Sequence, residues 1–151
     1  MAMTMNGEYE LSVPPQTVWE KLNDAATLKA CIPGCERLDK TSDTEFQAVA
    51  TVKIGPVKAK FKGRVTLSDL DPPNGYKISG QGDGGVAGFA KGGATVKLAS
   101  KNGGTLLSYN VDAQIGGKLA QLGQRLVNGA AKKIADDFFA NFANAVNPKA
   151  A

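Results

Sequence analysis

The first part of the chain alternates apolar and polar positions. Over residues 7–13 every second side chain is apolar, and the positions between them carry Glu or Ser. A period of two is typical of a strand with one buried and one exposed face. Pro14 and Pro15 end this strand, and proline suits the first turn of a helix. Apolar residues at three- and four-residue spacing then predict a short helix over residues 15–23, and we expect a second over residues 25–31.

Turn-forming sequences recur at short intervals between residues 35 and 115. Clusters of Gly, Pro, Asn and Asp separate five or six segments, which predicts a meander of antiparallel hairpins. In the clearest segment, residues 57–68, small or apolar side chains alternate with polar ones. A shift of one residue would bury four cations, so the register is firmly set. These cations are Lys58, Lys60, Lys62 and Arg64.

The last segment, residues 117–147, carries apolar side chains at four-residue steps and predicts one long helix. Each step advances the stripe by about 40° around the helix, so the apolar face winds as it runs. A winding face suits a curved, twisted sheet. The stripe consists of Leu122, Leu126, Ala130, Ile134, Phe138, Phe142 and Val146.

This order of elements predicts an α+β fold in a single domain over residues 1–151, with residues 146–151 as a frayed tail. We expect a curved antiparallel sheet of about seven strands wrapped around the long C-terminal helix, with two short helices after the first strand. One helix covers only part of such a face. The rest of the face must therefore be filled or hollow.

Glycine is concentrated where the sheet is expected to curve. The chain has 18 Gly in 151 residues, well above the usual share of about 7%. Glycine inside strands marks bulges, bends or the close approach of another group. Two interpretations stay open, an apolar ligand cavity and tight packing of the helix on the sheet. The glycines concerned are Gly63, Gly80, Gly82, Gly84, Gly85, Gly88, Gly92 and Gly93.

The absence of His excludes several classes of catalyst. It rules out Ser-His-Asp relays, HExxH zinc sites and His-based proton shuttles. Cys31 and Cys35 lack the further ligands of a structural zinc site, so we expect reduced thiols. Tyr109 and Asp112 stand three positions apart on one strand and point to opposite faces. We therefore predict no catalytic residue and no metal site.

The net charge of +4 mildly favours anionic partners. The cationic row of the segment 57–68, joined by Lys53 from the preceding strand, points away from the apolar face. It is either a solvated outer face or a docking surface for an acidic partner or membrane headgroups. Nucleic acid is not expected, because no aromatic side chain interleaves with these cations. The sequence shows no membrane-spanning run and no signal-peptide pattern, so we expect a cytoplasmic protein.

Several longer motifs are similar to those of one known family. Residues 28–36 read Leu-Lys-Ala-Cys-Ile-Pro-Gly-Cys-Glu, residues 88–94 read Gly-Phe-Ala-Lys-Gly-Gly-Ala, and residues 116–123 read Gly-Gly-Lys-Leu-Ala-Gln-Leu-Gly. With shorter motifs they resemble the CoxG family of carbon monoxide dehydrogenase subunits, which is part of the START-like, polyketide cyclase-like superfamily. The resemblance covers residues 6–146 and implies the helix-grip fold. The shorter motifs are residues 52–57, 61–63 and 71–73.

The resemblance implies a non-enzymatic accessory protein of a molybdenum- and flavin-containing carbon monoxide dehydrogenase. Members of the family are associated with placing that enzyme at the cytoplasmic membrane and with carrying a membrane quinone. We therefore expect a lipophilic ligand such as menaquinone or ubiquinone, no covalently bound cofactor, and peripheral contact with the inner face of the membrane. The residues expected to face inward and line the cavity are Phe61, Val65, Leu67, Phe89, Tyr109, Val111, Leu122, Leu126, Ile134 and Phe138. The expected docking residues are Lys53, Lys58, Lys60, Lys62 and Arg64.

Two other functions stay open. A cyclase- or isomerase-like enzyme would use the same cavity and would need an inward polar side chain, for which Tyr109 is the candidate. A pure assembly factor would have a filled core and bind no ligand.

Overall fold

The structure is a computed structural model and describes residues 1–146. One strand is followed by two short helices, six strands and two further helices, with a single 3-10 turn, η1, between the fifth and sixth strands. The elements are β1 (Ala2–Leu11), α1 (Pro15–Leu22), α2 (Ala25–Cys31), β2 (Cys35–Ser42), β3 (Glu45–Ile54), β4 (Val57–Asp71), β5 (Gly75–Asp83), η1 (Gly85–Ala87), β6 (Phe89–Lys101), β7 (Gly104–Gly116), α3 (Lys118–Gln121) and α4 (Gln124–Val146).

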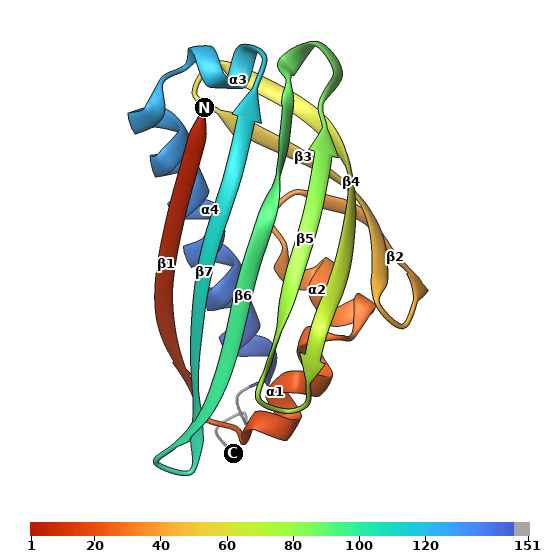
Figure 1. Cartoon of the computed structure of the whole chain (residues 1–151), viewed down its shortest axis with the longest axis vertical. Helices are drawn as coiled ribbons and strands as arrows, with labels where there is room; N and C mark the ends of the chain where they lie inside the picture. The colour runs from red at the N-terminus through yellow and green to blue at the C-terminus, as the bar shows by residue number, and fades with distance from the viewer. Residues whose placement is uncertain (147–151) are drawn as a thin grey trace.

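The strands form one seven-stranded sheet in the order β1-β7-β6-β5-β4-β3-β2. Every neighbouring pair is antiparallel. Helix α4 lies behind the sheet on the side of β1 and β7, and α1 and α2 lie across its lower end (Figure 1). A curved sheet that holds one long helix is the helix-grip fold, and the expected architecture is confirmed.

The register of β4 also follows the prediction. Phe61, Val65 and Leu67 are at least partly buried on the concave face, while the four cations that alternate with the inward positions of this strand are exposed. The same alternation continues across the sheet through the cross-strand pairs of β3, β5, β6 and β7. Burial of one face thus fixes which side chains can reach the space beneath the helix.

The two short helices begin where the sequence predicts. Pro15 takes the first turn of α1, and Asp24 caps α2. The Asp24 carboxylate accepts hydrogen bonds from the Thr27 hydroxyl at 2.6 Å and the Thr27 backbone N–H at 3.2 Å, which lower the pKa of Asp24. The Asn141 side chain donates to the Cys31 carbonyl at 3.0 Å. This last bond ties α2 to the long helix.

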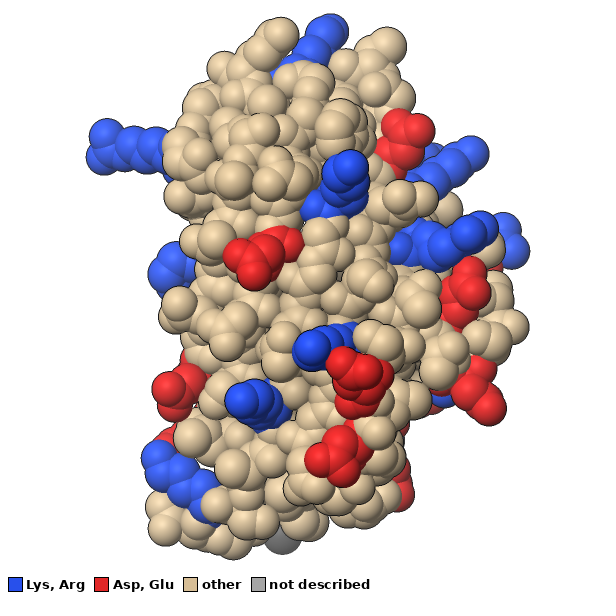
Figure 2. Space-filling view, in the orientation of Figure 1, with Lys and Arg blue, Asp and Glu red and all other residues tan. Residues whose placement is uncertain are grey.

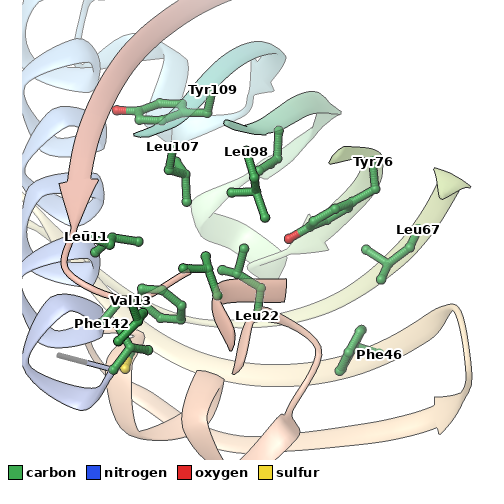
Figure 3. Packing of buried hydrophobic residues seen from close by; sticks show 14 residues of the cluster. Leu11, Val13, Leu22, Phe46, Leu67, Tyr76, Leu98, Leu107, Tyr109 and Phe142 are labelled. Carbon is green, nitrogen blue, oxygen red and sulfur yellow. The ribbon is translucent and has the colours of Figure 1, made fainter. Parts of the chain in front are cut away.

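Two hydrophobic clusters lie on the concave face. The larger, which we call the lower core, fills the end of the sheet near α1 and α2 (Figure 3). The smaller, the upper core, lies toward α3, and Val111 packs against both. The lower core contains Leu11, Val13, Val18, Leu22, Cys31, Phe46, Leu67, Tyr76, Val96, Leu98, Leu107, Tyr109, Phe142 and Val146, and the upper core Met3, Ile115, Leu119 and Val127.

The C-terminal helix is not continuous, contrary to the prediction. It breaks at Gly123, whose φ of 94° is in the left-handed region that favours glycine. The break rotates the start of α4, so that Val127 is 3% exposed while Leu126 is 40% exposed. Val146 is helical and buried, so the prediction of a frayed tail is wrong for residue 146. Residues 147–151 of that tail lie outside the described part of the chain.

Candidate functional site

An open apolar groove of about 350 Å³ lies on the concave face of the upper sheet. We call it the inner groove. Its floor is made of glycine and alanine from β5, β6 and β7, and its walls are the larger side chains Val65, Ile78 and Val111. The floor residues are Gly80, Gly82, Ala90, Gly92, Gly93, Ala94 and Ala113.

The inner groove follows from two rows of small residues that run across the strands. In one row Ala113 pairs with Gly92 and Gly92 with Gly80. In the next row Ala90 pairs with Gly82, and Gly82 pairs with Gly63. Because glycine and alanine project at most one methyl group from the sheet, these rows leave an open space above the strands.

The side chains that face the inner groove are apolar. Polar residues among its lining, Gln81, Lys91 and Asp112, alternate with the inward positions and are exposed. Among the described residues, no titratable side chain on these strands points into the inner groove. The groove therefore offers contact area and shape rather than proton-transfer groups.

The ten residues expected to line the cavity divide into several places. Val65 and Val111 line the inner groove. Leu67, Tyr109 and Phe138 belong to the lower core or pack against it, and Phe61 and Leu122 pack against the upper core. Ile134 is partly buried and belongs to neither core of the described chain.

Two of the ten do not face inward. Phe89 lies on the outer face, beside Gly116 of β7 and Asp83 of β5, and is 45% exposed. The inward position next to it is taken by Ala90, which lines the inner groove. Leu126 lies against Gly55 in the β3–β4 turn, because the break at Gly123 turns it away from the core.

A second, polar site lies between β1 and α4, and the sequence patterns did not indicate it. We call it the tyrosine window, a space of about 500 Å³ bordered by Tyr9, Tyr109, Lys132 and Asp136. The Tyr9 hydroxyl donates to Asp136 at 2.6 Å, and the Lys132 ammonium lies 2.8 Å from the same carboxylate. Burial and the bond to Asp136 raise the pKa of Tyr9. The bonds from Lys132 and Tyr9 lower the pKa of Asp136.

Aromatic rings connect the tyrosine window to the lower core. The Phe139 ring stacks on Tyr9 and Tyr109, with ring centres 4.2 and 5.3 Å away. Gly7 makes room for Tyr109, because a Cβ there would lie 2.8 Å from the Tyr109 hydroxyl. Tyr109, the candidate polar side chain for an enzyme, therefore borders this window and is not among the residues that line the inner groove.

The two cysteines are free thiols. Cys31 is buried in the lower core, and burial raises the pKa of both Cys31 and Cys35. A raised pKa keeps the thiol protonated and weakly reactive. Within residues 1–146 no cluster of three or more potential metal ligands occurs.

The predicted docking residues all lie exposed on the outer face. Lys53 and Lys58 are direct cross-strand neighbours at the end of the β3–β4 hairpin. Lys60 lies 3.6 Å from Glu36, and Arg64 lies 3.2 Å from Glu45. Figure 2 shows acidic and basic side chains interspersed over this face, with basic ones gathered at the upper right, over β3 and β4. In the described part of the chain, every helix is too short or too polar to cross a membrane.

Comparison with known proteins places the sequence in a family. The sequence model of CoxG, a family of carbon monoxide dehydrogenase subunits, matches residues 7–147. No curated protein matches the sequence.

Solved structures share the fold. A conserved protein from Geobacillus kaustophilus is 33% identical, with a TM-score of 0.89 and 95% of each chain covered. A protein from Chromobacterium violaceum is 16% identical, with a TM-score of 0.72 and coverage of 97% of this chain and 99% of that one. The Zhui aromatase/cyclase from Streptomyces sp. R1128 is 11% identical, with a TM-score of 0.70 and coverage of 97% and 94%. The family match spans nearly the whole described chain, and the chain therefore belongs to the CoxG family of carbon monoxide dehydrogenase subunits.

Proposed function

We propose that this protein is a non-enzymatic accessory protein of a carbon monoxide dehydrogenase and binds a lipophilic ligand in the inner groove. The observation that carries the proposal is the floor of glycine and alanine between two well-packed cores. A surface without projecting side chains accepts a flat ring along its whole face. The family name supports the dehydrogenase as the partner.

The size and the open mouth of the groove indicate how such a ligand would lie. Pockets for small molecules usually measure about 300–1,000 Å³, and the inner groove is near the lower limit. A ring system therefore fits against the floor, while a long chain would extend from the mouth. A membrane quinone, with a flat ring and an isoprenoid tail, has this shape.

Exposure of such a tail also gives a reason for contact with the membrane. The ligand would enter and leave through the mouth of the groove, and the outer cations would meet anionic headgroups or an acidic surface of the dehydrogenase. In this proposal the protein carries the ligand between the membrane and the dehydrogenase and carries out no chemistry on it. The apolar lining of the inner groove supports that division of roles.

The experiment is a thermal unfolding series with short-chain menaquinone and ubiquinone analogues. A ligand at 100 times its dissociation constant stabilises the native state by about 2.7 kcal/mol, which for a chain of this size raises Tm by roughly 5–10 °C. Organic extracts of the purified protein are analysed by mass spectrometry in parallel. The absence of a shift with both analogues, and of any lipophilic molecule in the extracts, would end the proposal.

A variant that fills the groove provides the matched test. A Cβ on Gly82 has only the Phe61 ring nearby, at 3.9 Å, so Gly82→Leu projects into free space. We expect this variant to unfold near the wild-type temperature and to lose the ligand-induced shift. Ser79→Leu, on the exposed face of the same strand, is the control and keeps the shift.

A further inference from the structure

A second groove lies on the opposite, outer face of the sheet. It measures about 1,110 Å³ and runs across β2 to β6, under the turn η1. We call it the outer groove. Its cations are Arg37, Lys62, Arg64 and Lys91, and only Lys62 and Arg64 were among the docking residues that the sequence predicted.

The outer groove forms where the β3–β4 hairpin leaves the rest of the sheet. The pairing of β4 with β5 ends at Lys62 and Asp83, and the earlier residues of β4 pair only with β3. In Figure 1 the β5–β6 connection projects at the top while β3 and β4 curve away behind it. The divergence leaves a trough between the turn and the curving hairpin.

The charge of the outer groove is only partly neutralised. Arg37 pairs with Asp39 at 2.7 Å, and Arg64 pairs with Glu45. The described ion pairs include neither Lys62 nor Lys91. The nearest acid by register, Asp83, already accepts the Gly85 backbone N–H at 2.8 Å. Two ammonium groups are therefore available to an anionic partner.

Two exposed apolar side chains border the same trough. Val86 on η1 is 85% exposed and Phe89 is 45% exposed. Both are held by a well-fixed turn. The Gly84 backbone N–H donates to the Gly88 carbonyl at 2.8 Å, and a Cβ on Gly88 would overlap the Gly116 carbonyl. Exposed aromatic groups in a concave, fixed setting are typical anchors of protein interfaces.

We infer that the outer groove binds an acidic segment of a partner protein that carries an apolar anchor residue. Carboxylates of the segment meet Lys62 and Lys91, and its apolar side chain packs on Phe89 and Val86. A segment of chain can enter a trough, whereas a flat membrane cannot follow it. The inference adds a partner site to the proposed function and is independent of the ligand in the inner groove.

The experiment follows binding by NMR with ¹⁵N-labelled protein and a synthetic peptide. The probe is a twelve-residue peptide of Glu and Leu around one Phe, and a second peptide replaces Leu and Phe by Ser. We expect shift changes concentrated at Lys62, Asp83, Phe89 and Lys91, and weaker binding at higher salt. The serine peptide should bind at least tenfold more weakly.

Matched variants separate a specific site from general attraction. The pair Lys62→Glu with Lys91→Glu should lower affinity at least tenfold. The pair Lys53→Glu with Lys58→Glu, which makes the same charge change outside the outer groove, should lower it less than threefold. Phe89→Ser should lower affinity about tenfold, while Leu70→Ser, at an exposed apolar residue elsewhere, should leave it unchanged. If Phe89→Ser does not fold, Val86→Ser replaces it.

Three outcomes would overturn the inference. The first is that the Glu-Leu-Phe peptide does not bind the wild-type protein. The second is that the Lys62/Lys91 and Lys53/Lys58 double variants lose the same amount of affinity for the peptide. The third is that vesicles of phosphatidylglycerol and phosphatidylcholine, but not the peptide, bind through Lys62 and Lys91. A failure here leaves the quinone-dependent shift in Tm untouched, so the two proposals are judged separately.

Discussion

Strands β5, β6 and β7 cross both halves of the concave face, and each changes character along its length. Toward α1 and α2 they contribute Tyr76, Val96 and Leu107, all buried. Toward η1 the same strands contribute Gly80, Gly92 and Ala113, which line an open groove. Hydrogen bonding and topology are the same in the two halves. The inward side chains of these strands are large toward α1 and α2 and small toward η1, so the lower half is packed while the upper half leaves an open groove.

The two halves also contribute differently, because the lower half supplies most of the stability and the upper half contains the proposed ligand site. A fully buried large apolar side chain stabilises the native state by about 1.5–3 kcal/mol, and the lower core contains most of them. The lower half can therefore support a domain in which the upper half leaves apolar surface uncovered. The following predictions test this division, from the largest expected effect to the smallest.

Truncation of a side chain should be costly in the lower core and mild at the inner groove. Phe142 is fully buried, and we expect Phe142→Ala to lower the free energy of unfolding by about 3–5 kcal/mol. Val65→Ala, at the open wall of the groove, should lower it by about 1 kcal/mol, because little new cavity is enclosed. Urea denaturation measures both. Equal losses would show that the upper half is packed as tightly as the lower.

Two glycines of the upper half should respond in opposite ways to alanine. A Cβ on Gly92 would overlap the Asp112 carbonyl and approach Ala113 Cα to 2.7 Å, whereas the Cβ of Gly82 has only one neighbour, at 3.9 Å. We expect Gly92→Ala to destabilise by about 1–3 kcal/mol. Gly82→Ala should be neutral or stabilise by about 0.5 kcal/mol, because alanine restricts the unfolded chain.

The variants of Gly92 and Gly82 also separate the two interpretations of the glycine excess, which were an open cavity and tight packing. Close approach of the neighbouring strand explains Gly92, and open space explains Gly82. Thermal unfolding of the two variants checks the distinction. A large loss in Gly82→Ala would argue that the inner groove closes in solution.

The smallest effect concerns the hydrogen bond from Tyr9 to Asp136, which joins β1 to α4 outside both cores. The pKa of Asp136 is lowered in the folded protein, so the bond stabilises above the unfolded pKa of about 3.9. The contribution is lost as the pH falls through the lower, folded pKa. Tyr9→Phe should therefore lower Tm slightly at pH 7, and the difference should vanish in strong acid. An unchanged difference at pH 2 would contradict this assignment.

The sequence predicted the strands well because one face of each is buried. In β4 the alternation from Lys58 to Arg64 placed every side chain on its observed face. The helix break was missed because the four-residue apolar steps continue from Leu122 to Leu126 across Gly123, whose observed φ is in the region that favours glycine. Phe89 was placed inward by its hydrophobicity. Strand alternation from Ala90 and Gly92 would have placed it outward.

Other features depend on packing that no local pattern records. Tyr9 and Asp136 are 127 positions apart, and their contact depends on how α4 is rotated after the break. The outer groove depends on where the pairing of β4 with β5 ends, and that point is determined by how the whole sheet bends. A single sequence carries no periodic signal for either. The tyrosine window and the outer groove therefore emerge only with the assembled fold.

The pairing of β1 with β7 has a consequence for how the chain folds. Ala2 lies opposite Gln114, and Leu11 lies opposite Thr105. β1 is an edge strand that pairs only with β7, so it gains no strand partner until β7 is available. Pairing between strands so far apart in the sequence slows folding, because the entropy cost of closing the long loop comes before the strand contacts that offset it. The hairpins from β2 to β7 are expected to form first, and the apolar residues of β1 stay exposed until β7 is in place.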